Sequence, residues 1–184
     1  MADSETTGDS APSPNTVADL LPGDATGPAL LTVDNVVMDH AALRGEVDRL
    51  AGQLRAAGLR ANDRIAIVLP NGPEMALVLL AAMSVGCAAP LNPKYREDEF
   101  RFYLDDLHAA ALITIDGASP AAHSAAPVGT VSIDARGEGL SIDLITASQA
   151  STSSTDRPAA DDQALVLHTS GTTSRPKIVP LRQR

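Results

Sequence analysis

The chain has 184 residues, of which 44% are hydrophobic and 20% charged, a balance expected of a single soluble globular domain. Its formal net charge of −9, with two Phe, two Tyr and no Trp, disfavours nucleic acid as a partner, because such binding needs clustered cations or stacking aromatics. The single cysteine excludes an internal disulfide framework and favours a reducing, cytoplasmic location.

The first 28 residues are predicted to form a disordered acidic tail. They hold five acids and no Lys or Arg, and they are rich in Ser, Thr, Asp, Pro and Gly. The N-terminus has neither the basic nor the apolar region of a secretory signal. We therefore expect the folded domain to occupy residues 29–184.

A hairpin followed by an amphipathic helix is predicted next. The apolar runs Leu30–Val33 and Val36–Met38 flank an Asp-Asn pair, and both of these residue types tolerate the left-handed geometry of a tight turn. Asp39 is suited to cap a helix over about residues 40–57, in which apolar residues recur at helical spacing on one face. Gly58 is a natural stop for that helix.

Alternating strands and helices follow, and their order predicts an α/β fold. A run of β-branched and apolar residues indicates a strand buried on both faces, a helix comes next, and the pattern then repeats. The predicted elements are strand 65–69, helix 74–85, strand 88–91, helix 98–106, strand 112–115 and a weaker strand near 131–134. Strand–helix–strand units at this spacing imply parallel pairing, so we expect a three-layer fold with a mostly parallel sheet and flanking helices.

One long apolar stretch raises the question of a membrane span. Met75–Leu91 is uncharged for 17 residues, but Ser84, Gly86 and Pro90 interrupt it, which favours a helix followed by a strand over a membrane-spanning helix. Cys87 lies inside this stretch with no Lys or Arg nearby. A buried structural thiol is therefore predicted rather than a nucleophile.

The segment with chemical content comes near the end of the chain. After a polar connection over residues 146–162, a strand over 164–168 leads into five small residues, four of which carry a hydroxyl group. Such a loop offers backbone N–H groups and hydroxyls to an anion, while Arg175 and Lys177 supply positive charge. Phosphate binding and a solvated Ser/Thr loop without a ligand both remain open from the residues alone.

Three known loop types do not fit the amino-acid sequence. A Walker A loop starting at Gly171 would need Gly and Ser/Thr where Pro176 and Ile178 stand. A hydrolase nucleophile elbow would need Gly in place of His168 and Thr172. The Gly-Glu-Gly at 137–139 begins like a dinucleotide fingerprint, but the third glycine is absent and no helix is expected after it.

The loop does resemble the AMP-binding signature of the adenylate-forming superfamily, which includes acyl-CoA synthetases. That signature reads Thr-Ser-Gly-Thr-Thr-Gly-x-Pro-Lys-Gly, and this chain has Thr-Ser-Gly-Thr-Thr-Ser-Arg-Pro-Lys-Ile over residues 169–178. Ser174 and Ile178 thus replace glycines, and Ile178 is interpreted as the start of a return strand. Further segments fall in the family's order, namely Leu50–Leu54, Asp63–Ile67, Leu69–Glu74 and Pro90–Pro93.

A narrower resemblance points to oxalate–CoA ligases. It is carried by Leu91–Pro93, Glu99–Leu104 and the block from His168 to Lys177. Within this block, His168 is interpreted as a strand-end residue rather than a catalytic base.

The resemblance implies an ATP-dependent acid–thiol ligase that works through an acyl-adenylate, with a carboxylic acid, ATP and coenzyme A as substrates and Mg²⁺ held by ligands outside this chain. It implies the first subdomain of an incomplete N-terminal domain, inactive alone, so no catalytic residue and no metal ligand is assigned here. A gene fragment is the first explanation of that expectation and a degenerate ligase the second. A non-catalytic nucleotide-phosphate binding module and a ligand-free fold remnant stay open as alternatives. The residues implied to bind the β- and γ-phosphates are Thr169, Ser170, Gly171, Thr172, Thr173 and Lys177.

Overall fold

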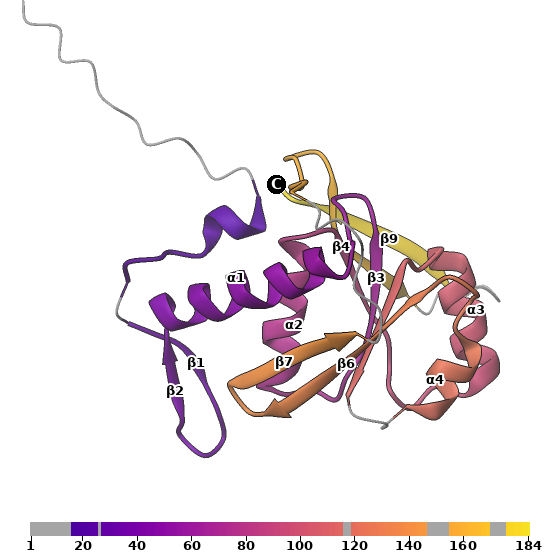
Figure 1. The fold of residues 1–184 in the computed structure, drawn as a ribbon, viewed down its shortest axis with the longest axis horizontal. Helices are drawn as coiled ribbons and strands as arrows, with labels where there is room; N and C mark the ends of the chain where they lie inside the picture. Colours follow the sequence, from indigo (N-terminus) through magenta and orange to yellow (C-terminus); the bar gives the residue numbers. More distant parts are fainter. Residues whose placement is uncertain (1–15, 26, 116–118, 147–154, 170–175) are drawn as a thin grey trace, which may run out of the picture.

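A computed structural model describes residues 16–25, 27–115, 119–146, 155–169 and 176–184. Its centre is a seven-stranded sheet in the order β7-β6-β5-β3-β4-β8-β9 (Figure 1). The five strands from β6 to β8 run parallel to one another, while β7 and β9 are antiparallel to their neighbours at the two edges. The strands are β3 (Arg64–Val68), β4 (Cys87–Pro90), β5 (Ala111–Ile115), β6 (Val131–Glu138), β7 (Ser141–Thr146), β8 (Gln163–Thr169) and β9 (Lys177–Arg182).

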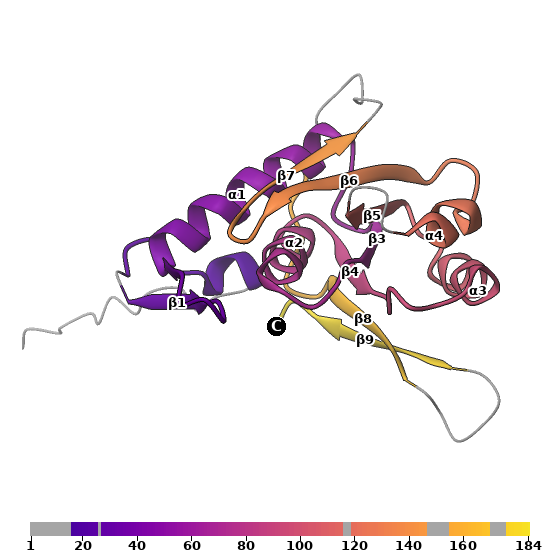
Figure 2. The ribbon, with the colours of Figure 1, turned by 90° about the horizontal axis from the view of Figure 1, so that it is seen from below.

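Helices cover both faces of the sheet, which confirms the predicted α/β fold (Figure 2). The helices α1 (His40–Ala56) and α2 (Pro73–Met83) pack on one face, and α3 (Glu97–Leu107) and α4 (Pro120–Ala125) on the other. Successive β3 side chains alternate between the two cores, as the strand pleat requires: Ile65 and Ile67 join the α1–α2 core, whereas Ala66 and Val68 join the α3–α4 core. Aliphatic side chains fill most of each core, so both faces of the sheet are packed although aromatic residues are scarce.

The N-terminal hairpin and the first helix form as predicted. Strands β1 (Pro28–Leu31) and β2 (Val37–Asp39) pair antiparallel, and Asn35 in the turn between them has a φ of 59°. The Asp39 carboxylate accepts a 2.7 Å hydrogen bond from the Ala42 N–H, which caps α1. Gly58, just beyond the helix, has a φ of 92°.

The expected disordered tail over residues 1–28 needs correction in its second half. Residues 1–15 lie outside the described residues, but Val17–Leu20 forms a 3-10 turn, η1. The Val17 N–H donates to the side-chain oxygen of Gln183 at 2.9 Å, and the Arg44 guanidinium donates to the carbonyls of Ala18 and Leu21, each at 2.8 Å. These long-range partners order a segment whose composition alone suggests no structure.

Two further elements were not predicted. The weak strand near 131–134 extends to Glu138, with Gly137 at φ 121° inside it, and the chain turns back through Gly139, at φ 65°, into β7. The Gly-Glu-Gly segment thus ends a strand and begins a hairpin turn, which agrees with its rejection as a dinucleotide fingerprint. The short helix α4 was also missed, because its six residues are too few to show helical periodicity.

The apolar stretch Met75–Leu91 divides as predicted into a helix, α2, and a strand, β4. Within the described ranges, no helix has both the length and the apolar character that a bilayer crossing would require.

The last two strands form a hairpin at one edge of the sheet. Strand β8 is aligned with β4 at a single residue pair, Ala88 with Leu165, whereas its pairing with β9 continues from Gln163 to Thr169. Both strands were predicted, β8 from its apolar run and β9 from Ile178. Figure 2 shows this hairpin extending away from the helices α1 and α2.

Candidate functional site

The carboxyl ends of the parallel strands gather the candidate site at one edge of the sheet. Strand β8 is parallel to β4, so Thr169, its last residue, lies at the same edge as the loops that follow β3 and β4. In α/β sheets this edge is where ligands bind as a rule. The fold therefore presents the hydroxyl-rich segment at the edge where a ligand site is expected.

Two of the six predicted phosphate-binding residues are described, and the structure pairs them. Thr169 at the end of β8 lies opposite Lys177 at the start of β9, and both residues are exposed. The other four, Ser170, Gly171, Thr172 and Thr173, lie outside the described residues. A hydroxyl and a cation thus face each other at the base of the predicted loop, with their side chains open to solvent.

His168 holds this base against helix α3. Its side chain is only 5% exposed, and its Nε2 lies 3.2 Å from an oxygen of Asp106, in the last turn of α3. The ring also contacts Tyr103 edge to face, with the centroids 4.7 Å apart. Within the described part of the chain, its Nδ1 is the single buried side-chain N or O atom without a hydrogen-bond partner. His168 is the penultimate residue of β8, which agrees with its prediction as a strand-end residue, whereas nothing in the sequence singled out Asp106.

The departure from the family signature at position 178 has a packing explanation. Ile178 pairs with His168 across the hairpin and packs against the α3–α4 core. A glycine there would leave that contact unmade. The two arginines at the chain end are already engaged, because Arg182 and Arg184 lie 3.5 and 3.3 Å from Asp161. Lys177 is the described cation nearest to Thr169 in the strand register.

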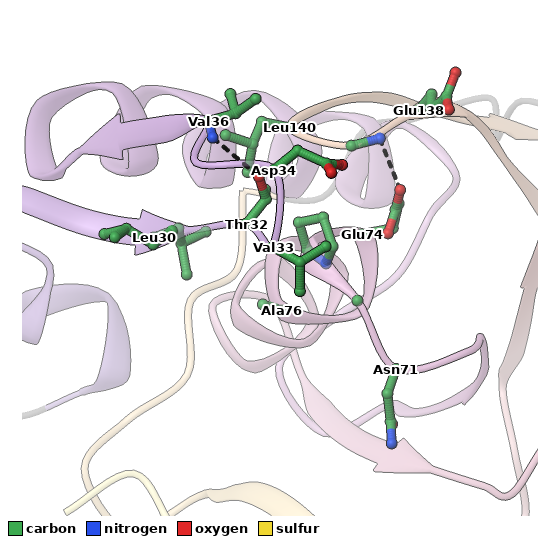
Figure 3. Close-up of a pocket in the computed structure, with 14 residues that line it drawn as sticks. Leu30, Thr32, Val33, Asp34, Val36, Asn71, Glu74, Ala76, Glu138 and Leu140 are labelled. Carbon is green, nitrogen blue, oxygen red and sulfur yellow. Dashed lines mark hydrogen bonds between the residues drawn. The ribbon is translucent and has the colours of Figure 1, made fainter.

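Two cavities open at the same edge of the sheet. The larger, of about 650 Å³, lies between the β1–β2 hairpin, the start of α2 and the β6–β7 turn (Figure 3). Glu74 extends along its wall and accepts a 2.7 Å hydrogen bond from the Gly139 N–H, while Leu30, Val33 and Leu140 make it largely apolar. The second cavity, of about 580 Å³, lies beyond the ends of β3 and β4 and contains Lys94; Asn71 lines both.

Cys87 is structural, as predicted. It is 2% exposed, and burial raises the pKa of its thiol to about 11, although the charge of Arg64 acts in the opposite direction. Such a thiol is protonated at neutral pH and therefore a poor nucleophile. No group of three or more His, Cys, Asp or Glu side chains is placed to hold a metal ion in the described ranges.

The fold is of the α/β class, and the hairpin places Thr169 and Lys177 at the carboxyl ends of the parallel strands, where ligands bind as a rule in such sheets. The sequence identifies the family: residues 25–184 match the AMP-binding enzyme family. The chain belongs to that family.

Similar proteins agree with this assignment. The chain is 38% identical over 154 residues to an oxalate–CoA ligase from Arabidopsis thaliana, covering 79% of this chain and 30% of that protein. It is also 38% identical over 165 residues to a probable CoA ligase, CCL9, from Humulus lupulus, covering 84% and 31%. The fold is that of ATP-bound MatB from Rhodopseudomonas palustris, with a TM-score of 0.70, 24% identity, and coverage of 92% of this chain and 35% of that one. The chain therefore spans about a third of the length of the relatives it matches.

Proposed function

We propose that the β8–β9 hairpin binds the β- and γ-phosphates of ATP, as part of an adenylate-forming acid–thiol ligase. One observation carries the proposal: the register that pairs exposed Thr169 with exposed Lys177 at the carboxyl edge of the sheet. The residues between them, Ser170 to Thr173, complete the proposed set. Membership of the AMP-binding enzyme family and the CoA ligases among the relatives support it.

The proposed chemistry is charge neutralisation of a leaving group. When a carboxylate attacks the α-phosphorus of ATP, negative charge grows on the departing pyrophosphate. The Lys177 ammonium can meet that charge directly, and Thr169 and its neighbours can donate O–H and N–H groups to the phosphate oxygens. Both described groups are solvent-accessible and carry donors, so they fit a polyanion. Mg²⁺, which would share this charge, is proposed to have its ligands elsewhere.

The proposed substrates are a carboxylic acid, ATP and coenzyme A, with the oxalate–CoA ligases among the relatives as a chemical precedent. Because the chain spans 30% of the length of the Arabidopsis relative, we expect the 184-residue chain to bind nucleotide without forming an acyl-adenylate. ATP–pyrophosphate exchange with a panel of acids measures this directly. Turnover by the purified chain would show instead that it carries complete catalytic machinery.

The binding proposal is tested by titrating the chain with ATP, and separately with tripolyphosphate, while following the backbone amides by NMR. The Thr169 and Lys177 amides should shift with both ligands. Lys177→Ala should weaken both affinities about tenfold or more, because a charge-assisted hydrogen bond contributes roughly 1.5–3 kcal/mol. Arg60→Ala is the matched control: it removes one exposed positive charge from the turn before β3, at the opposite edge of the sheet.

The outcomes separate the alternatives. Binding without exchange is the result expected of this chain, and loss of that binding in Lys177→Ala but not in Arg60→Ala supports the hairpin as its location. No shift with millimolar ATP would contradict the proposal for this chain and favour a fold remnant without a ligand. Equal weakening by both substitutions would indicate general electrostatic attraction rather than a site.

A further inference from the structure

Asp106 occupies a position that helix electrostatics disfavours. It lies next to Asp105 in the last turn of α3, where no basic residue is present and the helix dipole is negative. A carboxylate at this end of a helix destabilises the fold unless a hydrogen-bond donor or a positive charge compensates for it. The compensating partner is His168, whose Nε2 lies 3.2 Å from an Asp106 oxygen although 62 residues separate the two.

The direction of this hydrogen bond fixes the place of one imidazole hydrogen. An ionised carboxylate can only accept, so the His168 Nε2 must carry the hydrogen that it donates to Asp106. The other ring nitrogen, Nδ1, is buried without a partner. Burial of an unpaired polar atom costs free energy, so a Leu side chain would suit the packing of this site better than a half-satisfied His.

A residue that is unfavourable for packing, yet tied to an unfavourably placed acid, points to a role other than stability. Thr169 follows His168 directly, and Lys177 pairs with Thr169 across the hairpin. The contact with Asp106 therefore fixes the end of β8 against α3, and through the ladder it fixes the Thr169–Lys177 pair.

We propose that His168, held by Asp106, is a positioning residue that sets where Thr169 and Lys177 meet the triphosphate of ATP. This inference rests on the proposed function, because it assigns the hairpin's orientation to a contact outside the phosphate-binding residues. The Tyr103 ring, edge-on to His168 at 4.7 Å, limits the rotation of the imidazole on the same side.

The test separates positioning from folding. His168→Leu removes the hydrogen bond together with the orphaned nitrogen, so its melting temperature should equal or exceed that of the parent chain, while ATP affinity falls about three- to tenfold. His168→Gln, whose amide can still donate toward Asp106, should restore the affinity to within about twofold of the parent. Asp106→Ala should lower the ATP affinity as much as His168→Leu does. The double variant that carries both substitutions should lose no more affinity than either single variant, because both substitutions remove the same contact.

Asp105→Ala is the matched control, since it removes one carboxylate from the same helical turn without contacting His168. If it weakens ATP binding as much as Asp106→Ala, the effect is the helix charge and the proposal is wrong. Parallel losses of melting temperature and affinity in His168→Leu would likewise overturn it, because a purely structural role predicts them.

A second readout keeps this inference distinct from the proposed function. Without any ligand, the amide resonances of Thr169 and Lys177 should move in His168→Leu and Asp106→Ala and stay in place in Asp105→Ala. If these shifts appear but the parent chain binds no ATP, the proposed function fails while the positioning contact stands. If the resonances do not respond and ATP binds normally in all variants, the positioning role is excluded and the hairpin site stands.

Discussion

Gly86 is the position where the structure makes its sharpest stability prediction. It joins α2 to β4, its N–H donates to the Ala82 carbonyl at 2.8 Å, and the next amide, of Cys87, donates to the Asp63 carbonyl at 2.9 Å. A methyl group added here would lie 2.5 Å from the Asp63 carbonyl oxygen and 2.9 Å from that of Arg60. Both oxygens belong to the backbone of the turn that leads into β3, so no side-chain rotation can relieve the clash.

Gly86→Ala should therefore force α2 and β4 away from that turn. Overpacking of this kind costs roughly 1–3 kcal/mol. For a chain of this size each kcal/mol lowers the melting temperature by about 2–4 °C, so a fall of roughly 2–12 °C is expected, measured by circular dichroism.

The same substitution at Gly52 should act in the opposite direction. Gly52 lies in the interior of α1 on its exposed side, and an added methyl group would meet nothing within 4 Å. Alanine there should stabilise the chain by roughly 0.5–1 kcal/mol, because glycine loses more backbone freedom on folding. A Gly86→Ala variant that melts at or above the parent temperature, with Gly52→Ala behaving as expected, would refute the steric reasoning.

Two further predictions concern titratable groups. Cys87 should resist iodoacetamide at pH 8 in the folded chain and react fully in urea, because burial raises its pKa to about 11; rapid labelling of the folded chain, read by mass spectrometry, would contradict this. The pKa of Asp143 is lowered by hydrogen bonds from Gln53 and, to a smaller extent, from Arg49. The contribution of this carboxylate to stability is therefore fully present above the ordinary carboxyl pKa, about 3.9. It is lost as the pH falls through the lower pKa of the folded state. Asp143→Asn should accordingly flatten the dependence of the urea midpoint on pH below about 4, and an unchanged slope would exclude the carboxylate as its source.

The elements that were predicted correctly are those whose signal is local. The Asp39 cap, the helical spacing of α1 and the β-branched run of β3 each act through residues near in sequence. Strand β7 also carried a local signal, since Ile142 and Leu144 are buried while the residues on either side of them are exposed, but the strand begins directly after a glycine-containing turn. Recognising this strand depends on knowing that α1 packs over it, where Gln53 and Arg49 of the helix form hydrogen bonds with the strand.

The candidate site shows the same division. The hydroxyl-rich segment and Lys177 could be recognised in the sequence because a phosphate-binding loop is a continuous segment. The contact between His168 and Asp106 could not be recognised in this way. It depends on the position of the last turn of α3 relative to β8, to which the packing of Phe100 and Leu104 in the α3–α4 core contributes. The order in residues 17–20 has the same origin, since its partners Arg44 and Gln183 are remote in sequence.

The single aligned pair between β4 and β8 gives the final hairpin a mechanical character of its own. Six paired positions keep β8 and β9 together as one stiff unit, while its attachment to the sheet is narrow. The contacts of His168 with Asp106 and of Ile178 with the α3–α4 core therefore decide how that unit sits on the sheet. Thr169 and Lys177 are thus presented as a preformed pair whose orientation depends on packing against α3 more than on the strand ladder with β4.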